Sequence, residues 1–309
     1  MVARVACAGE CMVELREQPD GSLIRGYGGD TLNTAVYLAR LGVPVDYVTA
    51  LGDDAWSDEM VAGWQAEGVN TGHVHRLPGR LPGLYIIQTD ATGERRFSYW
   101  RDSAAARHVF DHADLEALSG FDVLYVSGIT LSIFDRAARE TLLATLRRLR
   151  QRGGRVVFDT NFRPRGWPDR DVARSLYEQV FTLSDMVFAS AEDLVQLFGP
   201  DGDAALLRHA DTVEIILKAE QPSCRVLHGG IVVTVAAEPV AKVVDTTAAG
   251  DSFAAAYLAA RLRGAEPIEA ARAGHALAGL VVGHSGAVIP RSAMASLMQA
   301  NRDGAVSAP

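Results

Sequence analysis

Short apolar runs alternate with longer stretches of helical spacing through most of the chain. The first run, Val2–Ala8, is almost entirely apolar, which is typical of a strand buried on both faces of a parallel sheet. Between Asp30 and Leu41 apolar residues recur every three or four positions, and Gly42 marks the end of a helix. The same alternation predicts strands at 45–50, 123–127, 155–159, 186–189 and 213–218, and helices at 59–67, 136–152, 172–182 and 192–198. Repeated strand–helix units predict an α/β fold with a doubly wound, mainly parallel sheet flanked by helices.

Two segments, 12–27 and 83–101, interrupt this alternation with the two-residue period of β-hairpins. They predict a small β-sheet that stands off the main one as a lid. A further hairpin around 226–235 is expected at the edge of the main sheet. Helices are expected at 250–263, 267–283 and 292–298. With no linker or repeat in view, the sequence predicts a single domain over 1–300 and a flexible tail at 301–309.

Composition and charge narrow the class of protein. The 309 residues carry a formal net charge of -8 and no run of lysine or arginine, which disfavours a nucleic-acid partner. Of the three cysteines, Cys7 and Cys11 would lie about 13 Å apart in a strand, too far for a disulfide. No signal peptide is evident, and the apolar run near 276–283 is too short to cross a membrane. We therefore expect a cytoplasmic protein without a membrane partner.

The segment 244–253 combines small residues with a carboxylate where a strand gives way to a helix. Backbone N–H groups at the start of a helix lack internal partners and form an anion site, which small side chains leave accessible. Asp251 would lie beside an anion bound there and could take a proton from a hydroxyl group. Alternatively, Asp251 only caps the helix.

The paired glycines Gly28 and Gly29 precede the helix that begins near Asp30. Paired glycines let the backbone approach a ligand, and Asn33 would lie one turn into the helix on the same side. The alternative is a simple turn in which Asp30 or Thr31 caps the helix.

Both segments resemble signatures of the ribokinase-like (PfkB) carbohydrate kinases. Residues 245–251 are similar to the second signature, D-T-x-G-A-G-D, and residues 28–33, 41–42 and 51–54 to the first. The resemblance implies a ribokinase-like fold in which Asp251 is the catalytic base and Ala248, Ala249 and Gly250 form the anion hole for the γ-phosphate of ATP. It also implies that Gly28, Gly29, Asp30 and Asn33 bind the sugar. Ala248 stands where the family usually has glycine, but alanine is small enough to keep the backbone accessible.

Within the family, the chain is most similar to kinases of 2-keto-3-deoxygluconate, in segments 9–15, 28–34, 80–85, 99–101 and 161–164. A sugar acid presents a carboxylate, which the planar donors of an arginine match. Arg101 and Arg163 are the candidates, and Tyr85 and Tyr99 can offer the sugar a hydroxyl and a ring face. By this resemblance the 6-hydroxyl faces Asp251 and the carboxylate faces the lid.

Other interpretations of the same residues remain open. The two tyrosines can simply pack within the lid, and Arg101 can be a surface residue. The substrate can be the galactonate epimer, or a neutral sugar such as fructose or ribose. A sugar-binding sensor without catalysis is the alternative from another class of protein.

The nucleotide side of the site is less typical of the family. No Walker motif is present, and the resemblance places ATP beyond Lys218, with Asn161, Gly250 and His275 as further nucleotide-binding residues. The segment 218–223 lacks both glycines of the K-x-G-x-x-G pattern found in many relatives, and Glu220 can repel a phosphate. His275 is equally consistent with a histidine packed against its own helix.

Phosphoryl transfer needs cations to offset the phosphate charge, normally Mg²⁺. Glu192 and Asp193 can hold the metal through water, or only favour the start of their helix. A monovalent cation such as K⁺ near Asp245, Thr247 and 285–287 is implied by the resemblance alone. The exposed lid edge further suggests a homo-oligomer.

Overall fold

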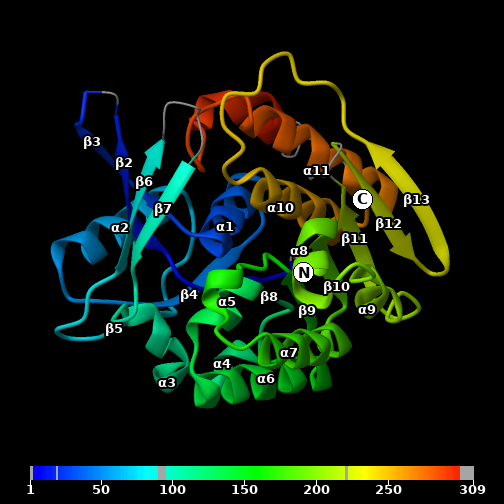
Figure 1. Ribbon diagram of the computed structural model, residues 1–309, viewed down its shortest axis with the longest axis horizontal. Coiled ribbons are helices and arrows are strands. Elements are labelled where there is room, and N and C mark those ends of the chain that lie inside the picture. The colour runs from blue at the N-terminus through cyan, green and yellow to red at the C-terminus, as the bar shows by residue number, and fades with distance from the viewer. Residues whose placement is uncertain (1–2, 19, 90–94, 220–221, 300–309) are drawn as a thin grey trace.

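Nine strands form the larger of two sheets in the computed structural model, which describes residues 3–18, 20–89, 95–219 and 222–299. Seven neighbouring strands are parallel, and the last two in the chain add an antiparallel hairpin at one edge. The order is β13 (Ile231–Ala236), β12 (Ser223–His228), β11 (Glu214–Lys218), β10 (Met186–Ser190), β9 (Arg155–Asp159), β8 (Val123–Ser127), β1 (Val5–Ala8), β4 (Val45–Leu51) and β5 (Val74–Arg76). The expected doubly wound, mainly parallel sheet is confirmed (Figure 1).

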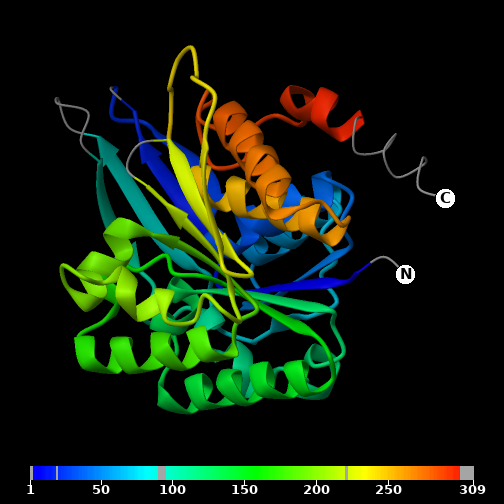
Figure 2. The same cartoon turned by 90° about the vertical axis from the view of Figure 1, so that its right-hand side faces the viewer.

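Helices cover both faces of this sheet (Figure 2). One face packs against α1 (Asp30–Arg40), α2 (Ala55–Ala66), α10 (Ala249–Leu262) and α11 (Pro267–Val281). The other packs against α3 (Val109–His112), α4 (Leu115–Leu118), α5 (Gly128–Ile133), α6 (Arg136–Gln151), α7 (Arg170–Leu183), α8 (Ala191–Phe198) and α9 (Asp203–Leu207). Successive side chains of a strand alternate between these cores: Val123 and Tyr125 enter the first, and Leu124 and Val126 the second. Burial on both faces explains the continuous apolar runs in the sequence.

The smaller sheet contains β3 (Leu23–Gly28), β2 (Met12–Glu17), β6 (Gly83–Thr89) and β7 (Arg95–Trp100), in that order. We call these four strands the lid. They come from the two segments that the alternation predicted, and the lid stands at the end of the molecule away from the β12–β13 hairpin (Figure 1). In the lid, Tyr85 of β6 lies directly opposite Tyr99 of β7.

Several boundaries differ from the sequence prediction. Helix α2 begins at Ala55 and not at 59, because Asp54 accepts hydrogen bonds from the N–H groups of Trp56 and Ser57. Helices α3, α4, α5 and α9 were not predicted, and neither were the 3₁₀ turns η1 (Ala105–His108) and η2 (Pro164–Gly166). The expected helix 292–298 begins as the 3₁₀ turn η3 (Arg291–Met294). The expected tail 301–309 lies outside the described residues.

The three cysteines are free and buried, as expected. Among the helices that the structure describes, none combines the length and apolar character that a membrane span requires.

Candidate active site

A cleft of about 2100 Å³ lies between the lid and the carboxyl ends of the parallel strands. Because these ends meet along one edge of the sheet, polar residues that are distant in sequence come together there. Glu10 follows β1, Asn161 follows β9, Asp193 lies just beyond β10 and Lys218 ends β11. The cleft is lined by nearly all of the predicted residues: Gly28, Gly29, Asp30, Asn33, Tyr85, Tyr99, Arg101, Asn161, Arg163, Glu192, Asp193, Lys218, Ala248, Ala249, Gly250 and Asp251.

Asp251 lies in the first turn of α10. Its Oδ2 accepts a hydrogen bond from Asn33 Nδ2 at 2.8 Å, and the N-cap of the helix is Ala248, so Asp251 is not a capping residue. The pKa of Asp251 is raised from 3.8 to about 8, first by burial and then by the charge of Asp30. The raised pKa makes this carboxylate, which is open to the cleft on one side, a stronger base than an ordinary aspartate when it is ionised.

The start of α10 has an unusual backbone. Ala248 has φ 60° and ψ 15°, the left-handed conformation that favours glycine, which explains the glycine found here in the family signature. The N–H of Ala249 donates to Thr246 O at 3.2 Å. Among the described residues, the N–H groups of Ala248, Gly250 and Asp251 have no acceptor. The N–H groups available to an anion therefore differ from the expected set, because that of Ala249 is already bonded.

Lys218 faces the same helix start. A Cβ atom added at Gly250 would lie 3.2 Å from Lys218 Nζ, so the ammonium group stands directly beside these N–H groups. Lys218 also donates to Asp159 Oδ2 at 3.4 Å. Positive charge and free N–H donors thus converge at the start of α10.

The paired glycines are required by close packing and not by a turn. A Cβ at Gly28 would lie 2.0 Å from the Tyr85 hydroxyl, and one at Gly29 would lie 2.2 Å from Glu10 O. Gly29 is the N-cap of α1, so the alternative in which Asp30 or Thr31 caps the helix is wrong. Asp30 instead accepts a hydrogen bond from Asn161 Nδ2 at 2.7 Å, and burial raises the pKa of Asp30.

The two predicted arginines line the cleft, but each already has an internal partner. Arg101 Nη2 donates to the buried carboxylate of Glu10. Arg163 lies 3.7 Å from Asp193 Oδ1 and donates to Phe162 O at 2.9 Å. The Arg101 guanidinium lies 5.7 Å from the ring centre of Tyr99. Burial raises the pKa of Tyr99, and the charges of Arg101 and Arg163 oppose that rise.

Tyr85 differs from the expectation in one respect. Its hydroxyl donates to Glu14, whose other oxygen accepts from Arg16 Nη2 at 2.7 Å. Burial and then the Glu14 charge raise the pKa of Tyr85. The Tyr85 hydroxyl therefore cannot donate its proton to a sugar, and only the ring face of Tyr85 is available for contact with a sugar. That ring lies 5.8 Å from the ring of Tyr99, measured between centroids.

Acidic residues line the wall opposite the lid. Asp193 Oδ2 accepts from Thr160 Oγ1 at 2.8 Å, and burial raises the pKa of Asp193. Glu192 accepts from Gln196 at 2.8 Å. Asp159, at the end of β9 and 4% exposed, was missed in the sequence, although its position at the carboxyl end of a parallel strand was a usable signal.

No group of three acidic, histidine or cysteine side chains among the described residues can hold a metal ion without other ligands. These carboxylates therefore suit a metal that receives most of its ligands from phosphates and water, as Mg²⁺ commonly does.

Three further predictions concern residues at the margin of the cleft. His275 does not line it: the ring packs edge-on against Phe253 at 4.9 Å and contacts Val235 O at 3.0 Å. Asp245 joins the two loops of the expected monovalent-cation site, because it accepts from the N–H groups of Thr247 at 2.9 Å and Gly286 at 3.0 Å. Glu220 lies outside the described residues.

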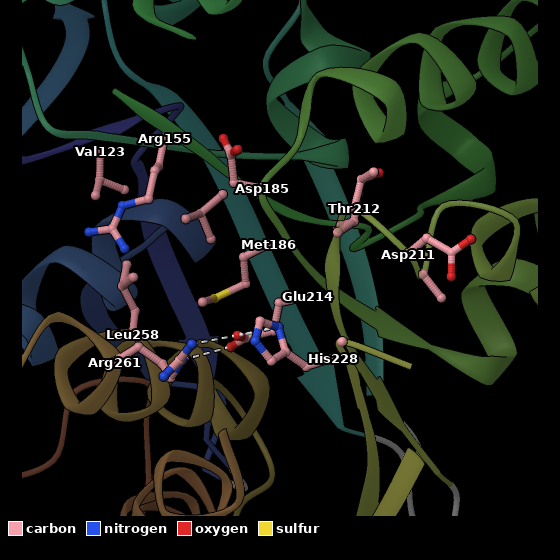
Figure 3. Close-up of a pocket in the computed structure, with 14 residues that line it drawn as sticks. Val123, Arg155, Asp185, Met186, Asp211, Thr212, Glu214, His228, Leu258 and Arg261 are labelled. Atoms are coloured by element: carbon pink, nitrogen blue, oxygen red, sulfur yellow. Dashed lines mark hydrogen bonds and ion pairs between the residues drawn. The ribbon is translucent and has the colours of Figure 1, made fainter. Parts of the chain in front are cut away.

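A second cavity, of about 260 Å³, lies at the opposite edge of the sheet, where β8, β9, β10 and β11 begin. Figure 3 shows Glu214 between Arg261 and His228. Glu214 accepts from Tyr257 at 2.7 Å and from Arg261 Nη2 at 2.8 Å, and lies 3.2 Å from His228 Nδ1. These groups satisfy one another, so the cavity is separate from the cleft in both place and chemistry.

Comparison with known proteins agrees with this geometry. A model of the pfkB family carbohydrate kinases matches residues 2–294. The 2-dehydro-3-deoxygluconokinase of Dickeya dadantii is 46% identical over 304 residues, covering 94% of this chain and 98% of the relative. The enzyme of the same name from Escherichia coli K12 is 44% identical over 308 residues, covering 95% and 99%.

Solved structures share the fold. A fructokinase with bound ATP from Xylella fastidiosa superimposes with a TM-score of 0.85 at 25% identity, covering 98% of this chain and 100% of that one. The 2-dehydro-3-deoxygluconokinase of Thermotoga maritima gives 0.81 at 22% identity, covering 96% and 99%. The lid, the cleft at the strand ends and the family match together identify the chain as a member of the pfkB family of carbohydrate kinases.

Proposed function

We propose that this carbohydrate kinase transfers the γ-phosphate of ATP to the 6-hydroxyl of 2-keto-3-deoxygluconate, also called 2-dehydro-3-deoxygluconate. The observation that carries the proposal is that the two ends of one cleft differ in charge. A carboxylate with a raised pKa, Asp251, stands at one end, and two guanidinium groups, Arg101 and Arg163, face the phenol of Tyr99 beneath the lid. A sugar acid has the matching ends, a hydroxyl and a carboxylate. The relatives at 44–46% identity carry this activity in their names.

Asp251 is the proposed base. The hydrogen bond from Asn33 fixes Oδ2, and no donor to the other oxygen is found in the described part of the chain. That free oxygen accepts the hydroxyl proton as the sugar oxygen bonds to the γ-phosphorus. The bond from the γ-phosphorus to the bridging oxygen breaks, and ADP leaves with that oxygen.

The start of α10 holds the transferring phosphate in this proposal. The N–H groups of Ala248 and Gly250 and the ammonium of Lys218 would bind it together, and the helix dipole adds to their field. Mg²⁺, when bound with ATP, would offset the negative charge of the phosphates. Asp193 and Glu192 are placed to accept hydrogen bonds from water around such a metal. A monovalent cation beside Asp245 stays a prediction.

The lid has two proposed roles. It covers the sugar and so keeps water from the γ-phosphate. It also leaves Leu23, Ile24 and Trp100 between 50% and 57% exposed, a surface that suits the predicted homo-oligomer.

The nearest alternative is a kinase for a neutral sugar, and the structure weighs against it. A neutral sugar brings no anion to Arg101 and Arg163. The galactonate epimer differs from the proposed substrate only in the direction of one hydroxyl, and it is the second candidate for the same site.

Steady-state turnover of the purified protein tests the proposal. Release of ADP is coupled to NADH oxidation, with ATP·Mg²⁺ and one of four sugars: 2-keto-3-deoxygluconate, its galactonate epimer, fructose or ribose. We expect kcat/KM for the gluconate to exceed that for either neutral sugar by about 100-fold or more. Preference for fructose or ribose contradicts the proposal, and no turnover of any of the four favours a sensor without catalysis.

A further inference from the structure

Arg107 lies in the 3₁₀ turn η1, six residues beyond Arg101 along the segment that returns from the lid. Its side chain is half-buried and lines the cleft. No hydrogen bond or ion pair of this guanidinium is found among the residues that the structure describes. A half-buried cation without a bonded partner is costly, and such costs are usually borne at functional sites.

Another cation, Arg139, lines the same cleft as Arg107. The guanidinium of Arg139 stacks 4.7 Å from the ring centre of Trp167 and donates to Leu131 O at 2.9 Å. Burial lowers the pKa of Arg139, the charge of Asp135 opposes that fall, and the charge of Arg107 adds to it. Like charges repel each other, so Arg107 gains no stabilisation from Arg139.

Arg107 shares the cleft with Glu10, which is 2% exposed. Its Oε2 accepts from Arg101, and its Oε1 is buried without a hydrogen-bond partner among the described residues. Burial raises the pKa of Glu10, and the charges of Arg101 and then Arg107 oppose that rise. Arg101 therefore bonds to a buried carboxylate whose negative charge Arg107 also offsets.

The charge balance of this group suits an anionic substrate. Glu10 alone with Arg101 would be neutral, and Arg101 would then attract a substrate carboxylate only weakly. With Arg107 the group carries one net positive charge, which a sugar acid neutralises. We infer that Arg107 is a further specificity-determining residue, which offsets the charge of Glu10 so that Arg101 remains available to the carboxylate of the sugar acid.

The inference rests on the proposed function, and charge compensation between two positions tests it. The variant Arg107→Gln should raise KM for 2-keto-3-deoxygluconate about tenfold, because the group becomes neutral. Its kcat and its KM for ATP should stay within about twofold of wild type, since the reacting atoms are at the other end of the cleft. Arg107→Lys keeps the charge and should keep KM within about threefold of wild type.

The double variant Glu10→Gln/Arg107→Gln separates charge from structure. It restores one net positive charge, so KM should return to within about threefold of wild type. Loss of packing would instead make the double variant worse than Arg107→Gln. Arg148→Gln removes an exposed positive charge from α6 and is the matched control, for which we expect wild-type constants.

The inference is overturned if Arg107→Gln leaves KM unchanged, or if the double variant does not recover. If Arg107→Gln fails to fold, Glu10→Gln is compared with the double variant, and a tenfold higher KM in the double variant overturns the inference. Failure of the proposed function is distinct, because the wild-type protein would then not turn over the sugar acid.

Discussion

Asp251→Asn should make the protein more stable while removing the proposed base. Burial and the Asp30 charge raise the pKa of Asp251 from 3.8 to about 8. One pKa unit corresponds to about 1.4 kcal/mol, so the charged form above pH 8 costs at most roughly 6 kcal/mol. Solvent in the cleft and proton uptake by Asp30 share this cost. We therefore expect the free energy of unfolding to rise by about 2 kcal/mol in the variant at high pH.

The gain in stability of the Asp251→Asn variant should increase as pH rises. Between about pH 4 and pH 8 the folded wild-type protein binds the Asp251 proton more tightly than the unfolded chain does, so its stability falls as pH rises. Asparagine carries no such proton. The advantage of the variant should be smaller at about pH 5.5 than at about pH 8.5.

Urea unfolding of both proteins at these two pH values, followed by circular dichroism, measures the difference. Equal advantages at both pH values would refute the raised pKa. A variant less stable than wild type at the higher pH would refute the argument that the charge is costly.

Three more substitutions test separate parts of the structure. Ala248→Gly should raise the free energy of unfolding by about 0.5–1 kcal/mol. The left-handed backbone costs alanine about 1–2 kcal/mol, and the greater freedom of glycine in the unfolded chain cancels part of that gain. Lower stability on urea unfolding would contradict this prediction. Gly28→Ala places a Cβ 2.0 Å from the Tyr85 hydroxyl, so kcat/KM for the sugar should fall about tenfold or more with KM for ATP unchanged, and wild-type kinetics would count against the packing. Glu214→Ala leaves Arg261 without its partner and should cost about 3–5 kcal/mol of stability with little change in kcat, whereas a loss below about 1 kcal/mol would show the pair to be dispensable.

The fold was largely readable from the sequence, because strands buried on both faces and helices buried on one face leave different periodicities. The strands 123–127 and 155–159 were predicted with the bounds that the structure gives. The short helices α3, α4, α5 and α9 were missed, since four to six residues are too few to show a helical period. The start of α2 was misplaced because the cap at Asp54 was not recognised.

The candidate site likewise contains residues that could be recognised in the sequence and residues that could not. Asp251 and the glycine pair belong to local segments with their own chemistry, so they could be singled out, and the cleft brings them together. Arg107 belongs to no such motif, and Glu10 lies in the segment 9–15, where the sequence assigns it no role. Glu10 acquires its meaning from Arg101, 91 residues away in the chain, and only the folded structure shows that contact. The left-handed backbone of Ala248 could not be predicted either, because glycine and not alanine is the residue that indicates this conformation in a sequence.

The central claim is that Asp251 accepts the proton of the sugar hydroxyl, and kcat of Asp251→Asn with 2-keto-3-deoxygluconate and ATP·Mg²⁺ tests it most directly. The asparagine keeps the shape of the side chain and can still bond to Asn33. We predict a fall in kcat of at least about 100-fold, with KM for both substrates within about threefold of wild type. A kcat close to that of the wild-type enzyme would contradict the claim.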